Sequence, residues 1–256
     1  MSHSTQKMLL NHRLLTILVI GFASGLPLAL TGTTLQAWFT EAHVSLKAIG
    51  TLSLLGIPYT LKFLWAPFMD YYGFSRLGKR KGWMLLMQLA LVISLLCLSQ
   101  MDPATQTSSI GITALLIAFF SASQDISINA YTTDVLMPEE RGLGAAYTVF
   151  AYRIAVLVSG GLALVFADYF GWESMYQFMA FLMLLTMVPT YFAPRVADTL
   201  SSAHNLYQNT LFALRDILRR DKIILILFFI LFYKFGDALA LSLITNFLLH
   251  GLGFIK

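Results

Sequence analysis

The sequence predicts an all-α, polytopic membrane protein, and three observations support this prediction. Of the 256 residues, 57% are hydrophobic and only 12% are charged, whereas ordinary globular domains carry about 25% charged residues. The mean hydropathy is +0.72. The apolar residues also gather in stretches of the length that crosses a bilayer, which is about 20 helical residues. A chain with so few charges cannot cover the surface of a water-soluble domain.

Seven stretches have this length, and most of the charge lies between them. The predicted spans are residues 14–38, 47–69, 83–100, 109–133, 143–166, 174–193 and 223–249. The first stretch is a poor signal peptide, because Pro27 interrupts it and its hydrophobic run continues through Trp38 and Phe39.

The distribution of Lys and Arg predicts a cytoplasmic N-terminus. With that orientation, twelve of the 17 basic residues fall in cytoplasmic segments, Lys47 and Lys256 fall in outer segments, and the other three lie within spans. Cytoplasmic loops of membrane proteins carry such an excess of positive charge. The twelve are Lys7, Arg13, Arg76, Lys79, Arg80, Lys81, Arg141, Arg195, Arg215, Arg219, Arg220 and Lys222. These clusters need no nucleic acid to explain them, and they would attract anionic membrane lipid.

The polar segment 194–222 separates the sixth predicted span from the seventh. Leu211, Leu214 and Leu218 recur within it at helical spacing, a pattern typical of an amphipathic helix on a membrane surface. The predicted domains are a six-span half over 1–193, a cytoplasmic linker over 194–222, and a seventh span over 223–256 that begins a second half.

A short internal sequence repeat favours an architecture of two similar halves. GLPLALTGTT at 25–34 and GDALALSLIT at 236–245 match at Gly, Leu, Ala, Leu and Thr, at an offset of 211 residues. Shared composition of membrane helices is the alternative explanation. Transporters are often built from repeated halves with the substrate site between them, and two such halves would need roughly 400 residues. We therefore expect this chain to lack most of its second half.

The predicted span 109–133 carries a stripe of polar side chains. Ser121, Asp125 and Asn129 recur every four residues, with Gln124 and Thr132 beside them. Residues at this spacing share one helix face. Such a face lines a bundle interior or an aqueous path, or it only holds helices together through hydrogen bonds. We expect a functional role for Asp125, because a carboxylate is costlier to bury than an amide, whereas Gln124 and Asn129 fit either role.

Two basic residues lie within other spans. Arg153, in the middle of 143–166, keeps its proton and therefore needs a carboxylate partner or an anionic substrate group. Asp125 is its nearest candidate, because a short loop joins their spans. Lys62 lies in the cytoplasmic half of 47–69, where its side chain can extend to the membrane surface or act within the bundle.

The seventh predicted span contains Lys234 and Asp237, three residues apart. This spacing allows an ion pair on one helix face. Such a pair either neutralises itself so that the helix can insert, or opens when a proton or substrate arrives.

Catalytic and metal-binding motifs are absent from the sequence. It contains no HExxH, GxSxG, P-loop or Cys/His cluster, so we expect neither an enzyme nor a cofactor or metal. The single cysteine, Cys97, lies in an apolar run, where we expect a buried and unreactive thiol.

Five stretches of this sequence resemble one transporter family. They are GFASGLPLALTGTTLQAWF (21–39), LKFLWAPFMD (61–70), GKRKGW (78–83), SASQDISINAYTTDVLMPEERG (121–142) and YKFGDALALSLITNFLLHGLGF (233–254). They are similar to the AmpG-type muropeptide permeases of the major facilitator superfamily. The resemblance implies an importer of twelve or more helices in the inner membrane of a Gram-negative bacterium. Its partners would be protons and N-acetylglucosaminyl-anhydro-N-acetylmuramyl peptides.

The loop after the second predicted span resembles the superfamily's GxxxDRxGRR pattern. The resemblance implies gating residues on the cytoplasmic side: Asp70, Lys79, Arg80 and Arg141. The sequence departs from the pattern at Ala66 and Tyr71, where the family has Gly and Arg. The residues predicted for the substrate or proton pathway are Asp125, Gln124, Asn129, Arg153, Lys234 and Asp237.

Two other functions stay open at this point. The chain is either a different transporter of the superfamily, such as an acetyl-CoA carrier or a drug exporter, or a truncated fragment that does not transport without a second half. Competition by unlabelled muropeptide distinguishes the first alternative from a muropeptide permease.

Overall fold

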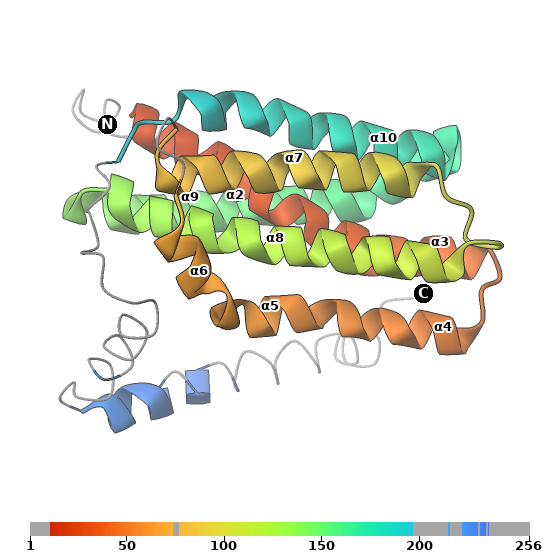
Figure 1. Ribbon diagram of the computed structural model, residues 1–256, viewed down its shortest axis with the longest axis horizontal. Helices are drawn as coiled ribbons and strands as arrows, with labels where there is room; N and C mark the ends of the chain where they lie inside the picture. Colours follow the sequence, from red (N-terminus) through yellow and green to blue (C-terminus); the bar gives the residue numbers. More distant parts are fainter. Residues whose placement is uncertain are drawn as a thin grey trace, which may run out of the picture. The chain divides into compact units, whose positions relative to one another are not determined.

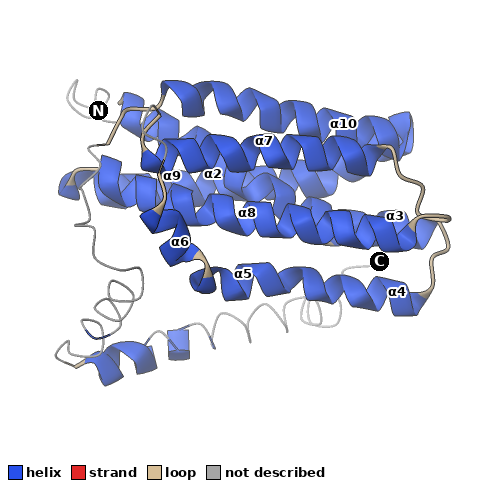
Figure 2. Cartoon of the chain, in the orientation of Figure 1, coloured by secondary structure: helices blue, strands red, loops and turns tan. Residues whose placement is uncertain are grey.

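A computed structural model of the chain describes residues 11–73, 77–196, 215, 222–229, 231–233 and 235. These residues form helices joined by loops, and none of them lies in a strand (Figure 2). The predicted all-α class is therefore confirmed. The chain divides into two compact units, residues 1–201 and 202–256. In the second unit the described helix covers 223–229 and 231–233, and most of the predicted seventh span lies outside the described residues.

Four segments of the described chain are long and apolar enough to cross a membrane. They are α2 (His12–Thr31) with α3 (Thr33–Glu41), α7 (Lys79–Ser99), α8 (Thr107–Val135), and a run of η3 (Pro138–Glu140), α9 (Arg141–Leu157), the π-helix η4 (Val158–Leu162) and α10 (Ala163–Phe192). The last run contains two predicted spans. It leaves helical geometry at Gly171, where φ is 81°, a value that suits glycine because it has no Cβ.

The predicted span 47–69 is helical but broken into short pieces. They are α4 (Leu46–Thr51), η1 (Leu52–Gly56), α5 (Ile57–Leu61), η2 (Lys62–Leu64) and α6 (Ala66–Tyr71). Pro58 and Pro67 lie at the starts of α5 and α6. Proline supplies no N–H to the preceding turn, so a helix tends to end before it. We call residues 46–71 the broken segment.

Helix α2 lies at the centre of the first unit and packs against α8, α9 and α10, while α7 packs between α8 and α10 (Figure 1). The broken segment runs along α8. Gly25 permits the close approach of α2 to α9, because a Cβ at this position would lie 2.5 Å from the carbonyl oxygen of Tyr152. Small residues allow such backbone contacts between membrane helices.

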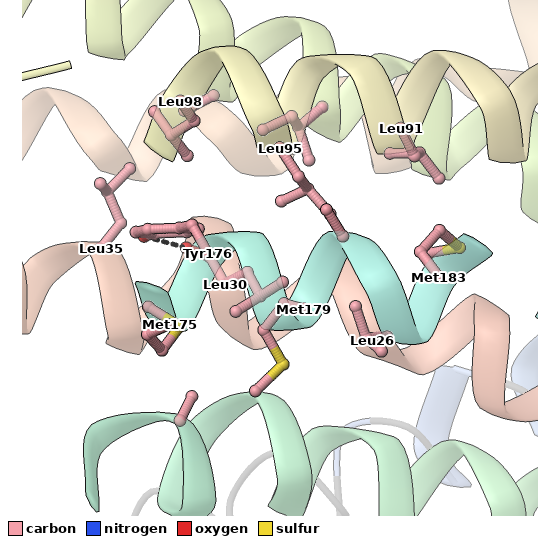
Figure 3. Close-up of a cluster of buried hydrophobic side chains, with 14 of the residues drawn as sticks. Leu26, Leu30, Leu35, Leu91, Leu95, Leu98, Met175, Tyr176, Met179 and Met183 are labelled. Carbon is pink, nitrogen blue, oxygen red and sulfur yellow. Dashed lines mark hydrogen bonds between the residues drawn. The ribbon is translucent and has the colours of Figure 1, made fainter. Parts of the chain in front are cut away.

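Buried aliphatic and aromatic side chains of α2, α3, α7 and α10 form the main core (Figure 3). Those labelled are Leu26, Leu30, Leu35, Leu91, Leu95, Leu98, Met175, Tyr176, Met179 and Met183. The hydroxyl of Tyr176 donates a hydrogen bond to the carbonyl oxygen of Leu30, at 3.3 Å. This bond satisfies the only polar atom of a fully buried side chain. Close packing, rather than removal from water, stabilises helix association in lipid.

The outer faces of the long helices are apolar as well. Ile93, Ile112 and Phe181 are each more than half exposed, at 54%, 63% and 51%. A surface of this kind on membrane-length helices is the surface of an integral membrane protein. Cys97 also lies on the exposed face of α7, one turn from Ile93. The prediction of a buried thiol is therefore wrong, because α7 turns Leu91, Leu95 and Leu98 inward instead.

Candidate functional site

A partly buried polar contact joins α8 to α2 and to the broken segment. The hydroxyl of Ser24 donates to Oδ1 of Asp125 at 2.5 Å. The ammonium of Lys62 lies 3.9 Å from Oδ2 of the same carboxylate. The Asp125 side chain is 16% exposed and that of Lys62 is 35% exposed. A carboxylate among apolar helices is stable only when it is paired or protonated, and here it has both a donor and a cation.

More polar atoms surround this contact. The indole N–H of Trp65 donates to the hydroxyl of Ser123 at 3.0 Å, which ties the broken segment to α8 a second time. Among the described residues, the side-chain polar atoms of Tyr59, Ser121 and Gln124 are buried and have no hydrogen-bond partner. Buried polar groups are normally paired, so unpaired ones in a cluster mark a place where a ligand or ions can bind.

The structure separates the predicted polar stripe of α8. Ser121 and Gln124 are buried, Asp125 is partly buried, and Asn129 is exposed. The side chain of Asn129 has no hydrogen bond within the described part of the chain. Asp125 and Gln124 thus lie within the polar contact region, whereas the side chain of Asn129 is exposed.

Arg153 does not pair with Asp125, contrary to expectation. Its side chain lies on an exposed face of α9, and the described residues provide no ion pair for its guanidinium. Lys62 takes this place instead, because the broken segment runs beside α8. Lys234 and Asp237 lie outside the described residues.

The predicted gating residues lie at the end of the bundle where α7 begins. Arg80 donates hydrogen bonds to Asp70, at the end of α6, and to Oδ2 of Asp134, at 3.4 Å. One guanidinium therefore connects the broken segment, α7 and α8. Lys79 lines a cavity next to this cluster. Arg141 is exposed at the start of α9 and has no ion pair with the described residues.

Sequence reasoning missed a second tie at the same end. Glu140 is 9% exposed, and it accepts hydrogen bonds from Nδ2 of Asn11 at 2.6 Å and from the backbone N–H of Met137 at 3.1 Å. Its carboxylate also lies 3.7 Å from Arg13. The contact joins residues 129 positions apart. Ser24 was missed for the same reason, because a serine in an apolar helix gives no sign of its partner.

A third interhelical hydrogen bond links two places where the helices depart from α-helical geometry, Gly32 and η4. Gly32, between α2 and α3, has φ −97° and ψ −108°. Two residues later, the hydroxyl of Thr34 donates to the carbonyl oxygen of Ser159 in the π-helix η4, at 2.6 Å, and both residues are fully buried. π-Bulges often occur at functional sites, and helix breaks are where long helices bend.

No group of three or more His, Cys, Asp or Glu side chains in the described chain is arranged to hold a metal ion. The charged groups of the site instead form pairs and networks inside a bundle of membrane-length helices. Charges within membrane-length helices often mark the path of a substrate or an ion.

Comparison with known proteins defines the family. The model of the Major Facilitator Superfamily matches residues 17–254. The chain belongs to the Major Facilitator Superfamily. It is 48% identical over 239 residues to the anhydromuropeptide permease of Escherichia coli strain K12, and the match covers 93% of this chain. It is also 40% identical over 262 residues to an uncharacterized protein of Haemophilus influenzae, and that match covers 100% of this chain.

The matched region is only part of these relatives. It covers 49% of the E. coli permease and 61% of the Haemophilus protein, so this chain spans about half the length of the curated relatives it matches. Membership of a transporter superfamily confirms that the chain is not an enzyme. The identity to the E. coli permease confirms the resemblance to the muropeptide permeases that the five sequence stretches predicted.

Proposed function

We propose that the chain contributes the N-terminal half of a proton-coupled importer of anhydromuropeptides in the inner membrane of a Gram-negative bacterium. Residues 1–193 form the six-span half, 194–222 the cytoplasmic linker and 223–256 the start of the second half. The N-terminus is cytoplasmic in this proposal, because that orientation places twelve of the 17 basic residues on the inner side. The identity to a named permease supports the substrate class.

The contact of Asp125 with Ser24 and Lys62 is the observation on which the mechanism rests. An ionised Asp125 holds Lys62, and this pair neutralises both charges inside the bundle. A proton on Asp125 removes the negative charge and releases Lys62 from it. The ammonium is then available to the carboxylates of a muropeptide, so proton binding and substrate binding are linked. Gln124 and Tyr59 supply uncommitted polar atoms for the hydroxyl and amide groups of the same substrate.

Arg153, Lys234, Asp237 and Asn129 remain candidates for the substrate or proton path. Arg153 and Asn129 are exposed on the described half. In a transporter of two halves, such polar residues would border the space between the halves, where the substrate site lies in this architecture. Asp70, Lys79, Arg80 and Arg141 would form the cytoplasmic gate.

Uptake in whole cells tests this proposal. The chain is expressed alone, and also joined to the remaining half of the E. coli permease, in cells that lack their own muropeptide importer. Uptake of labelled anhydro-disaccharide tripeptide is measured at matched membrane levels, with and without a protonophore. We expect protonophore-sensitive uptake from the joined form only.

A pair of carboxylate variants tests the role of Asp125. Asp125→Asn in the joined form should abolish proton-driven accumulation, whereas Asp168→Asn, at an exposed position of α10, should leave it unchanged. If Asp125→Asn transports with an unaltered pH dependence, the carboxylate carries no proton. Uptake that unlabelled muropeptide fails to compete would point instead to an acetyl-CoA carrier or a drug exporter.

A further inference from the structure

A basic cavity lies at the end of the bundle where α7 begins, between that helix and the chain that follows α10. Its volume is about 130 Å³. Lys79, Arg80, Lys81 and Arg195 line it together with Tyr131. A second cavity of about 440 Å³ shares the lining residues 194–196 and adds Arg13 and Asp134. Five cations and one carboxylate therefore border the two cavities.

Two of the five cations, Arg80 and Arg13, form ion pairs with carboxylates of the described chain. Asp134 and Asp70 pair with Arg80, and Glu140 pairs with Arg13. Lys81 has neutral contacts only within the described residues: its ammonium donates to the carbonyl oxygen of Ala193 at 3.2 Å and lies 5.5 Å from the ring centre of Tyr191. These contacts hold its charge in the cavity wall without neutralising it. Lys81 therefore brings to the cavity a positive charge that no carboxylate of the described residues neutralises.

The start of α7 adds donors to the same wall. Gly78 precedes the helix and has no side chain to cap it, and the first helical hydrogen bond runs from the N–H of Gly82 to its carbonyl oxygen. The N–H groups of residues 79–81 thus precede the first intrahelical bond, at the positive end of the helix dipole. An anion would meet both these donors and the basic side chains.

An apolar strip leads away from the cavity along α10. Leu185, Val188 and Phe192 follow one another at helical spacing, with exposed fractions of 48%, 56% and 68%. Phe192 lies two residues before Pro194, which lines the cavity. A ligand with an anionic head and an apolar tail would fit both surfaces at once. Free phosphate would use only the first.

We propose that this cavity binds the phosphate headgroup of an anionic phospholipid, whose acyl chain lies along the strip of Leu185, Val188 and Phe192. Basic pockets at the ends of membrane helices bind such headgroups. The bound lipid would bridge α7 and the segment after α10, which are 112 residues apart at the contact of Lys81 with Ala193. The proposal does not depend on which compound the protein transports.

Thermal unfolding of the purified chain in a neutral detergent tests the proposal. The midpoint is measured with added phosphatidylglycerol, with phosphatidylcholine, and with inorganic phosphate. We expect only phosphatidylglycerol to raise it, by about 5–10 °C at a lipid concentration near 100 times the dissociation constant. An equal effect of phosphatidylcholine would overturn the requirement for an anion. An equal effect of inorganic phosphate would overturn the assignment to a lipid.

Variants locate the site. The pair Lys81→Gln with Arg195→Gln should lose the response to phosphatidylglycerol, and the pair Lys81→Arg with Arg195→Lys should keep it. The control pair Lys47→Gln with Lys222→Gln removes the same charge at two exposed residues that do not line the cavity, and it should also keep the response. If the first pair folds poorly, Arg195→Gln alone is used, because Arg195 is exposed beyond the end of α10. A full response in the neutral variant, or an equal loss in the control, refutes the site.

Discussion

The close contact of α2 with α9 predicts that a single methyl group at Gly25 destabilises the bundle. An added Cβ would lie 2.5 Å from the carbonyl oxygen of Tyr152 and 3.0 Å from the Cβ of Ala155. The first distance is far inside van der Waals contact, and the contacting atom belongs to backbone that cannot rotate away. The two helices must therefore separate, and overpacking of this kind costs about 1–3 kcal/mol.

This cost converts into a measurable shift. For a protein of this size, 1 kcal/mol changes the midpoint of thermal unfolding by about 2–4 °C. Gly25→Ala should thus lower the midpoint by about 2–12 °C, measured by circular dichroism on the purified chain in detergent. Gly21→Ala should have a smaller effect, because its Cβ would lie 3.1 Å from Cα of Thr148.

Gly111→Ala in α8 is the matched control. A Cβ at Gly111 would meet no described atom within 4 Å. Alanine is also the better helix former by about 1 kcal/mol, so this variant should unfold at the same or a higher temperature. The order of midpoints is then Gly25→Ala, Gly21→Ala, Gly111→Ala from low to high. A Gly25→Ala midpoint at or above that of Gly111→Ala would refute the proposed close contact.

Two further predictions concern the polar ties. Thr34→Val removes the hydroxyl that donates to the carbonyl oxygen of Ser159, and it should lower the free energy of unfolding by about 1 kcal/mol. Thr40→Val removes an exposed hydroxyl and should lower it less. Chemical denaturation of each variant measures the difference, and equal costs would contradict it. Lys62→Gln should destabilise the chain more than Lys62→Gln combined with Asp125→Asn, because the single change leaves a buried carboxylate without its cation. Additive effects in a double-mutant cycle would show that the two side chains do not interact.

The sequence predicted the helical segments better than their contacts. Apolar length alone located α2, α7, α8 and α10, since a bilayer demands that length of any helix that crosses it. The break of the second span was not predicted, although Pro58 and Pro67 lie within it. The mean hydropathy of a membrane-length apolar stretch changes little with two prolines, so hydropathy alone does not show where the helix is interrupted.

The sequence identified Asp125 as a candidate site residue, but it did not identify the residues that contact Asp125. Asp125 stands out because a carboxylate is rare in an apolar helix. Its cation was assigned to Arg153 on loop length, whereas the structure uses Lys62 from a segment about 60 residues upstream. Sequence distance carries no information about which helices are neighbours in a bundle. Ser24 is a common residue type in membrane helices and differs from its neighbours only through its position beside Asp125.

The broken segment contacts α8 at two places, one at the candidate site and one at the predicted gating residues. The two contacts are separated by a similar number of residues on each segment. Lys62 contacts Asp125, and eight residues later Asp70 meets Arg80, which also contacts Asp134, nine residues after Asp125. Nine helical residues span about 13 Å, so polar contacts join α8 and the broken segment at two positions about that far apart. The prolines of the broken segment are where its helical path bends. Release of Lys62 from Asp125 would therefore act on the same segment that carries Asp70, a residue of the proposed gate.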